Sequence, residues 1–169
     1  FSKKQKRLIH YEIAIISYLL RDTDEASYYL NNVLEDQEHE DEELIISSLL
    51  YMAKVLFLKN ASASALKYIK HAMQKLENNK DSDFYAIAFM IYYEITERMD
   101  SSSSLNNYNE AQRLLKSRNL LNSKMNSSLI MPWYLVDDEK ERKKFLPIIE
   151  ESIEYAKQID NKFALSTAY

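Results

Sequence analysis

Hydrophobic positions between Leu49 and Leu76 form two helical stripes separated by a short break at residues 60–64. Apolar residues recur at the spacing of one helix face in both halves. They are Leu49, Met52, Ala53 and Leu56 in the first half and Ala65, Ile69 and Ala72 in the second. Small residues lie where two helices must approach closely, so the stretch predicts a helix-turn-helix hairpin of the kind that stacks into solenoids.

The same periodicity continues on both sides of this hairpin. It predicts helix pairs at residues 8–34, 44–77, 83–122 and 127–159, and the start of a further helix at 162–169. Asp22 or Thr23 is expected to cap the second helix, and Ser82 or Asp83 the helix that begins at Phe84. The expected core comprises Ala53, Leu56, Ala65, Ile69, Ala72, Ile87, Ala88, Ala111 and Leu115.

Composition supports an all-α fold in one domain. The 169 residues include no glycine and two prolines, so the chain has little means of making the positive-φ turns that hairpins between strands require. Without glycine it also cannot form a glycine-rich phosphate loop. Cysteine is absent as well, which excludes disulfides, thiol nucleophiles and cysteine-bound zinc.

The second helices of the predicted pairs can be aligned on Ala26, Ala65, Ala111 and Phe145, at intervals of 39, 46 and 34 residues. This pattern resembles the tetratricopeptide repeat (TPR) family. The hairpin at 44–77 fills a whole repeat of that family, and Asn106–Ala111 is similar to its turn, with Asn in place of Gly. The resemblance implies an α-solenoid of about four antiparallel helix pairs wound into a right-handed superhelix. Intervals near 40 residues are also similar to those of TPR-like sensor regions in bacterial regulators.

In the TPR register, one face of the first helices would line an inner groove. The resemblance places on it Tyr11, Tyr18, Lys54, Phe57, Tyr85, Phe89 and Tyr92. Aromatic side chains give a large contact area at modest entropic cost, which suits the capture of a peptide or helix. The alternative is that these rings pack between neighbouring helices. Both interpretations remain open at this stage.

The sequence nominates no catalytic, metal-binding or cofactor-binding residue. The three histidines share no ligand spacing, and no serine has the glycine-flanked context of a hydrolase nucleophile. A net charge of −4 disfavours a nucleic-acid surface, although Lys3–Arg7 and Lys140–Lys144 could form a local basic patch. No apolar run approaches the roughly 18 residues of a membrane span.

We therefore expect a non-enzymatic scaffold that binds a protein or peptide, as the sensory or interaction region of a larger regulatory or signalling protein. Helical accessory regions of enzymes and nucleic-acid-associated modules are the alternatives. No cofactor or membrane contact is expected, and homo-oligomerisation stays open. With no visible signal peptide, we expect a cytoplasmic location and read both ends as cuts from a longer chain.

Overall fold

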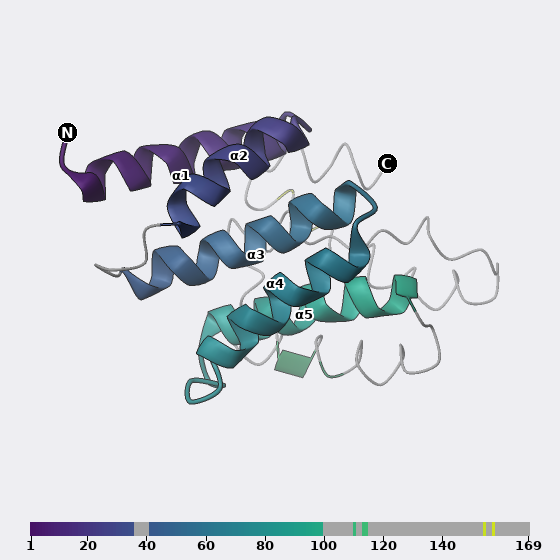
Figure 1. The fold of residues 1–169 in the computed structure, drawn as a ribbon. Helices are drawn as coiled ribbons and strands as arrows, with labels where there is room; N and C mark the ends of the chain where they lie inside the picture. The colour runs from purple at the N-terminus through teal and green to yellow at the C-terminus, as the bar shows by residue number, and fades with distance from the viewer. Residues whose placement is uncertain (36–40, 100–109, 111–112, 115–153, 155–156, 158–169) are drawn as a thin grey trace. The chain divides into compact units, whose positions relative to one another are not determined.

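The computed structural model describes residues 1–35, 41–99, 110, 113–114, 154 and 157. The chain divides into two compact units, Phe1–Gln112 and Arg113–Tyr169. Five helices have described bounds, and all lie in the first unit (Figure 1). They are α1 (Lys3–Leu19), α2 (Thr23–Leu34), α3 (Glu42–Leu58), α4 (Ser62–Lys75) and α5 (Asp83–Met99). No strand occurs in this described part, so the predicted all-α class is confirmed for it.

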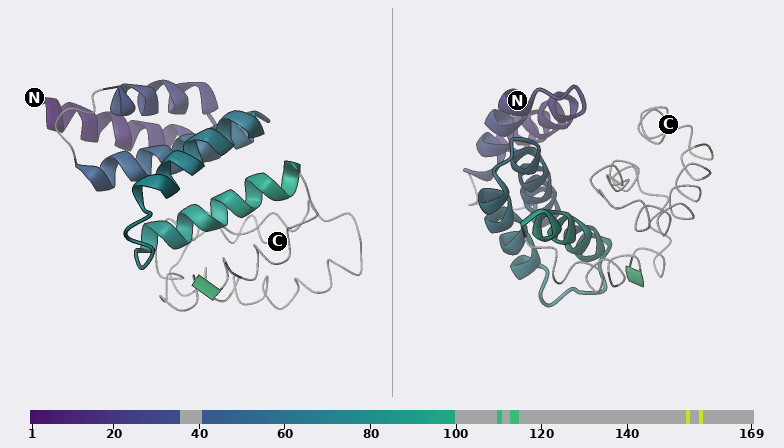
Figure 2. Two further views of the ribbon diagram at one scale, coloured as in Figure 1. Left: turned by 60° about the horizontal axis from the view of Figure 1, so that its bottom comes forward. Right: turned by 90° about the vertical axis from the view of Figure 1, so that its right-hand side faces the viewer.

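Each helix of the first unit packs on the next one along the chain, and α3 also contacts α1 and α5 (Figure 2). Four helices therefore surround α3. This explains why every residue from Ile45 to Val55 is buried. By contrast, α4 buries only a single stripe, formed by Ala65, Ile69 and Ala72. The hydrophobic pattern thus distinguishes the central helix from an outer one.

Helix α1 begins at Lys3, five residues before the predicted start at Leu8. A capping box explains the difference: the Ser2 hydroxyl accepts from the Gln5 N–H, and the Gln5 side chain accepts from the Ser2 N–H. The basic segment Lys3–Arg7 is accordingly helical. Arg7 is buried, and its guanidinium donates to the Val33 carbonyl at 3.0 Å, which fastens α1 to the end of α2.

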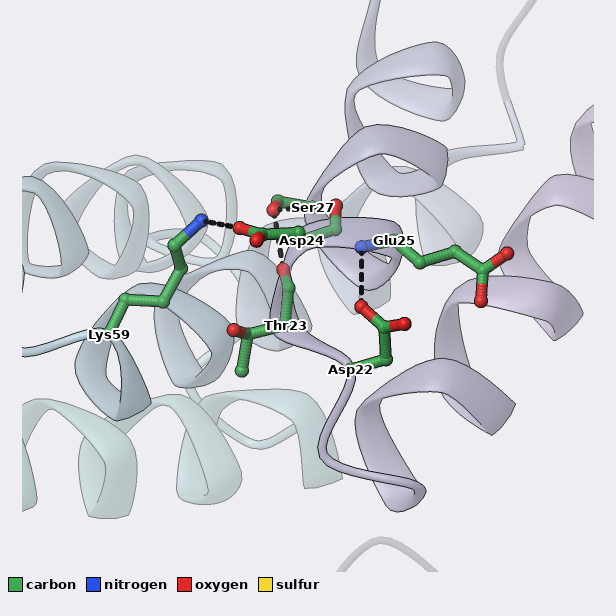
Figure 3. Close-up of polar contacts among 6 residues, drawn as sticks. All are labelled: Asp22, Thr23, Asp24, Glu25, Ser27 and Lys59. Atoms are coloured by element: carbon green, nitrogen blue, oxygen red, sulfur yellow. Dashed lines mark hydrogen bonds and ion pairs between the residues drawn. The ribbon is translucent and has the colours of Figure 1, made fainter.

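Side-chain caps start α2 and α5 at the predicted places. The Asp22 carboxylate accepts from the Glu25 N–H at 3.0 Å (Figure 3). The Ser82 hydroxyl accepts from the Tyr85 N–H at 3.1 Å. Each cap satisfies one of the backbone donors that a helix start leaves without an intrahelical acceptor.

The turns after α1 and α3 have the same construction. Arg21 (φ 65°) and Asn60 (φ 60°) are left-handed, and they lie 39 residues apart. In the first turn the Asp22 N–H donates back to the Ser17 carbonyl, and in the second the Ala61 N–H donates to the Leu56 carbonyl, both at 2.9 Å. These are Schellman motifs made without glycine. The second turn is shorter than the predicted break at 60–64, since α4 already begins at Ser62.

The inner faces of α2 and α4 repeat with the same 39-residue step. Three positions on each helix have no exposed surface, and they agree with the expected register: Ala26, Leu30 and Val33 on α2, and Ala65, Ile69 and Ala72 on α4. Across the two pairs, the exposed Asp24 carboxylate accepts from the Lys59 ammonium, which lowers the pKa of Asp24 (Figure 3).

Most of the predicted core is buried where the structure describes it. Ala53, Ala88 and Ile87 are almost fully covered, as are the buried positions of α4. Leu56 differs, because it is only half-buried near the end of α3. Ala111 and Leu115 lie outside the described residues. The same holds for the segment 162–169, for all of the predicted pair at 127–159 except residues 154 and 157, and for most of the pair at 83–122 beyond α5.

Candidate partner-binding face

The face predicted to bind a partner belongs to the odd-numbered helices, of which α1 and α5 each contact α3. The structure divides its seven residues into two groups. Tyr18 and Lys54 are buried, with exposed fractions of 9% and 6%. The other five are half-buried: Tyr11, Phe57, Tyr85, Phe89 and Tyr92. A partner could therefore reach the second group more readily than the first.

Between α1 and α3 lies a tyrosine cluster, made of Tyr11, Tyr18, Tyr51 and Lys54. The Tyr51 ring meets those of Tyr11 and Tyr18 edge-on, at centroid distances of 6.1 and 5.5 Å. The Lys54 ammonium lies 5.1 Å from the centroid of Tyr18 and 5.8 Å from that of Tyr51. Buried cation–π contacts of this kind contribute up to about 2 kcal/mol. The cluster is therefore a packing element, and the register analysis missed its central member, Tyr51.

Burial strengthens the preference of two phenols of this cluster, Tyr11 and Tyr51, for the neutral form. Removal from water raises the pKa of Tyr51 far above its ordinary value of 10. It also raises the pKa of Tyr11, although the Ser47 hydroxyl, hydrogen-bonded to Tyr11, opposes the change. Neutral phenols retain the negative ring faces that attract an ammonium group, so the cluster stays favourable for Lys54 throughout the neutral pH range.

On α5, a half-buried carboxyl group lies within the electrostatic reach of Lys54. Burial raises the pKa of Glu94 to about 7, Lys54 lowers it, and the nearby Glu97 raises it. Burial also raises the pKa of Glu97, against a lowering by its hydrogen bond with Tyr93. The sequence indicates this site in one way: Glu94 is a single charged residue within an otherwise apolar run on α5. The groove prediction did not include it.

A second aromatic group, the α5 stripe, is formed by Tyr85, Phe89 and Tyr92. Successive ring centroids are 6.4 and 6.2 Å apart, and spacings of four and three residues put the rings on one face of the helix. Positions between them on α5, among them Ala86, Met90 and Ile91, are buried. The half-buried stripe is therefore the side of α5 on which solvent reaches the rings.

The remaining aromatic residue of the face, Phe57, is held near the end of α3 by a contact from α5. The Arg98 guanidinium lies over the Phe57 ring at 5.1 Å and also donates to the Asn60 side-chain carbonyl at 2.6 Å. One cationic group thus ties α5 to both the ring and the left-handed turn. Phe57 is consequently less available than the α5 stripe.

Comparisons with family models, curated proteins and solved structures gave no match for this chain. Among the described residues, no three histidine, cysteine, aspartate or glutamate side chains are grouped so that they could hold a metal ion. No helix in the same residues is long and apolar enough to cross a membrane.

Proposed function

We propose that this protein is a non-catalytic scaffold that binds an apolar peptide or an amphipathic helix on the face of α1, α3 and α5. The observation that carries the proposal is the α5 stripe, three neighbouring half-buried rings that keep part of their surface exposed beside fully buried positions of the same helix. Apolar side chains with accessible faces in a row are the usual anchors for a helical or extended peptide.

Two features support a TPR-like solenoid as the frame of this scaffold. The turns after α1 and α3 have the same hydrogen bonds at a 39-residue step, and the first helices of successive pairs lie next to each other. Stacked repeats of this kind present their first helices along one extended surface. We extend the proposal to four helix pairs in a right-handed superhelix, as the TPR resemblance implies.

The different burial of the seven predicted residues sharpens the proposed site. Tyr18 and Lys54 already have partners inside the tyrosine cluster, and Phe57 is covered on one face by Arg98. Tyr85, Phe89 and Tyr92 contact mainly one another among the aromatic residues. We therefore assign the anchoring role to the α5 stripe and a supporting role to Tyr11 on α1. In the cell, this would be the interaction region of a larger cytoplasmic regulatory or signalling protein.

A peptide-display selection tests the proposal. The full chain is used as bait for a random peptide library, and the affinity of selected peptides is measured by calorimetry. We expect the selection to yield apolar, aromatic-rich peptides. Phe89→Ala or Tyr92→Ala should weaken the binding of these peptides by about 2 kcal/mol, roughly 30-fold. Tyr28→Ala is the matched control, because Tyr28 is an exposed tyrosine on α2.

Stability measurements on the same variants complete the test. Phe89→Ala and Tyr92→Ala should leave the melting temperature nearly unchanged if the rings serve a partner. Early unfolding of both variants would show that the stripe is packing. Selected peptides that bind both variants as tightly as the original chain would likewise refute the assignment.

A further inference from the structure

The solvent-facing side of α4 carries a basic stripe, which is formed by Lys67, Lys70, His71 and Lys75. Their spacings place these side chains on one side of the helix, opposite the positions that α4 buries. The first three are exposed and Lys75 is half-buried. No aspartate or glutamate occurs between Ser62 and Lys75. The helix therefore presents concentrated positive charge on a protein whose net charge is −4.

The charges of the basic stripe are not engaged within the described part of the chain. Other exposed lysines of the first unit do have acidic partners, Lys59 in Asp24 and Lys4 in Asp41. Among the described residues, no ion pair or side-chain hydrogen bond involves a member of the stripe. Like charges three residues apart, such as Lys67 and Lys70, repel each other on a helix surface. The stripe therefore opposes folding slightly instead of supporting it.

The 39-residue step shows that the fold does not require this charge. Tyr28 and Asn31 of α2 are the equivalents of Lys67 and Lys70, and both are exposed. Helix α2 contains no lysine or arginine, although it buries the same three positions as α4. A neutral or acidic outer side is therefore compatible with this module. The basic stripe of α4 needs an explanation outside the fold.

We propose that the basic stripe is a docking surface for an acidic helix of a protein partner. Charge names the chemistry of the partner, because unpaired lysines in a row attract carboxylates in a row. A second helix laid alongside α4 can present glutamates or aspartates at the same helical spacings. From Lys67 to Lys75 the stripe extends about 12 Å, the length of two helical turns. This surface differs from the partner-binding face, and the inference does not depend on the proposed function.

A nucleic acid fits this surface less well than an acidic helix does. Its phosphates continue beyond the stripe, and the exposed Glu77 lies only two residues after Lys75. The net charge of −4 also repels a long polyanion as it approaches. The stripe contains no arginine, the side chain that binds a phosphate through two parallel hydrogen bonds. An acidic helix of a few turns can cover the stripe and end before the carboxylate.

Fluorescence anisotropy with two synthetic alanine-based helical peptides tests the proposal on the full chain. The first peptide carries glutamates at the spacings of the basic stripe. The second has the same composition but spreads its glutamates around the helix. At low ionic strength the chain should bind the first peptide more tightly than the second, and added salt should weaken this binding. Equal binding of the two peptides, or no binding of either, overturns the proposal.

Substitutions in the stripe test which side chains hold the peptide. Lys67→Gln and Lys70→Gln should each weaken binding of the first peptide about threefold, the usual effect of losing one exposed ion pair. Lys6→Gln is the control, because it removes an exposed lysine of α1 and changes the net charge equally. The melting temperature of Lys70→Gln should not fall, since the substitution removes a repulsion. Unchanged binding, or weaker binding accompanied by a lower melting temperature, contradicts the proposal.

Two further measurements identify the class of partner. The double variant Lys67→Glu with Lys70→Glu should lose the glutamate peptide and bind a peptide with lysines at the same positions. Failure of this exchange would show that the charges do not pair across two helices. A DNA duplex and vesicles that contain anionic lipid are then used as competitors of the first peptide. Displacement by either one at a lower concentration of charge than the unlabelled peptide requires would assign the stripe to that ligand and overturn the proposal.

Discussion

The Lys54 ammonium on α3 lies 5.1 Å from the centre of the Tyr18 ring on α1, and the same ammonium acts electrostatically on Glu94 of α5. One buried cation therefore links all three odd-numbered helices. Its burial is compatible with its charge because the aromatic faces of Tyr18 and Tyr51 replace part of its hydration.

Replacing Lys54 by methionine should raise the pKa of Glu94 above about 7, since Lys54 is the group that lowers it. Methionine keeps most of the apolar stem of the side chain and removes only the charge. Carbon-13 NMR titration of the glutamate carboxyl groups measures the change. Lys67→Met is the control, because Lys67 is an exposed lysine on α4. An unchanged titration in Lys54→Met would mean that the two groups do not interact.

Stability should decrease as the pH rises from 4.5 to 7. In this range the unfolded chain releases a proton that folded Glu94 retains, because its folded-state pKa is about 7 instead of 4.5. The free energy of unfolding should fall by on the order of 3 kcal/mol over this range and level off at higher pH. The raised pKa of Glu97 acts in the same direction. Urea unfolding at a series of pH values measures the slope.

Glu94→Gln should flatten this slope and make the protein more stable than the original at pH 8. Glu77→Gln, at an exposed position after α4, is the matched control and should preserve the slope. If the slope persists unchanged in Glu94→Gln, other groups cause it.

An aspartate at position 61 should stabilise the protein by about 1 kcal/mol. Ala61 occupies the N-cap of α4, as Asp22 does in α2, but it offers no side-chain acceptor to the Ser64 N–H. Thermal unfolding of Ala61→Asp measures the gain. Ala61→Asn should act similarly, because it supplies the same kind of oxygen. A melting temperature that falls in both variants would show that the half-buried site does not accept a polar group.

Asn60 should tolerate glycine better than alanine. Its left-handed conformation costs alanine about 1 kcal/mol, whereas glycine adopts it freely. Both substitutions remove the hydrogen bond from Arg98. The difference in stability between the two variants therefore measures the cost of the left-handed backbone conformation alone. Denaturant midpoints of Asn60→Ala and Asn60→Gly provide the measurement. Equal stabilities would indicate that the turn relaxes out of the left-handed region.

Enlarging Ala65 to leucine should cost about 1–3 kcal/mol, because the residue has no exposed surface and its neighbours are close-packed. Ala26→Leu should behave alike, since Ala26 holds the equivalent place on α2. Ala63→Leu is the control, because Ala63 is exposed on the same helix as Ala65. Calorimetric melting of the three variants distinguishes a repeated core position from a general effect of leucine on helix α4.

Local chemistry made much of the fold predictable. The caps at Asp22 and Ser82 depend on side chains within three residues of the groups they bind, so the sequence alone was enough to locate them. The signal for the true start of α1 was equally local, because it lies in the Ser2 and Gln5 pair. The prediction placed the start later because it treated the basic residues 3–7 as a segment that precedes the helix. The 39-residue step was visible because buried alanines recur wherever two helices approach closely.

The site was predictable only in part, because its chemistry depends on contacts between helices. Tyr51 falls outside the groove register, and only the packing of α3 on α1 brings it between Tyr11 and Tyr18. The burial of Lys54 also depends on that packing. Likewise, the raised pKa of Glu94 reflects the desolvation of α5, which is a property of the assembled helices.

The equal construction of the two left-handed turns has a consequence for changes in chain length. Because Arg21 and Asn60 occupy equivalent points, a duplicated copy of residues 22–60 would begin and end in the same backbone conformation. Such an insertion would present each neighbouring helix with a surface of the kind it already meets. Insertions of other sizes inside a helix would rotate the residues that follow in that helix away from their partners. Within the described helices, viable changes of length should therefore be discrete, in multiples of one module.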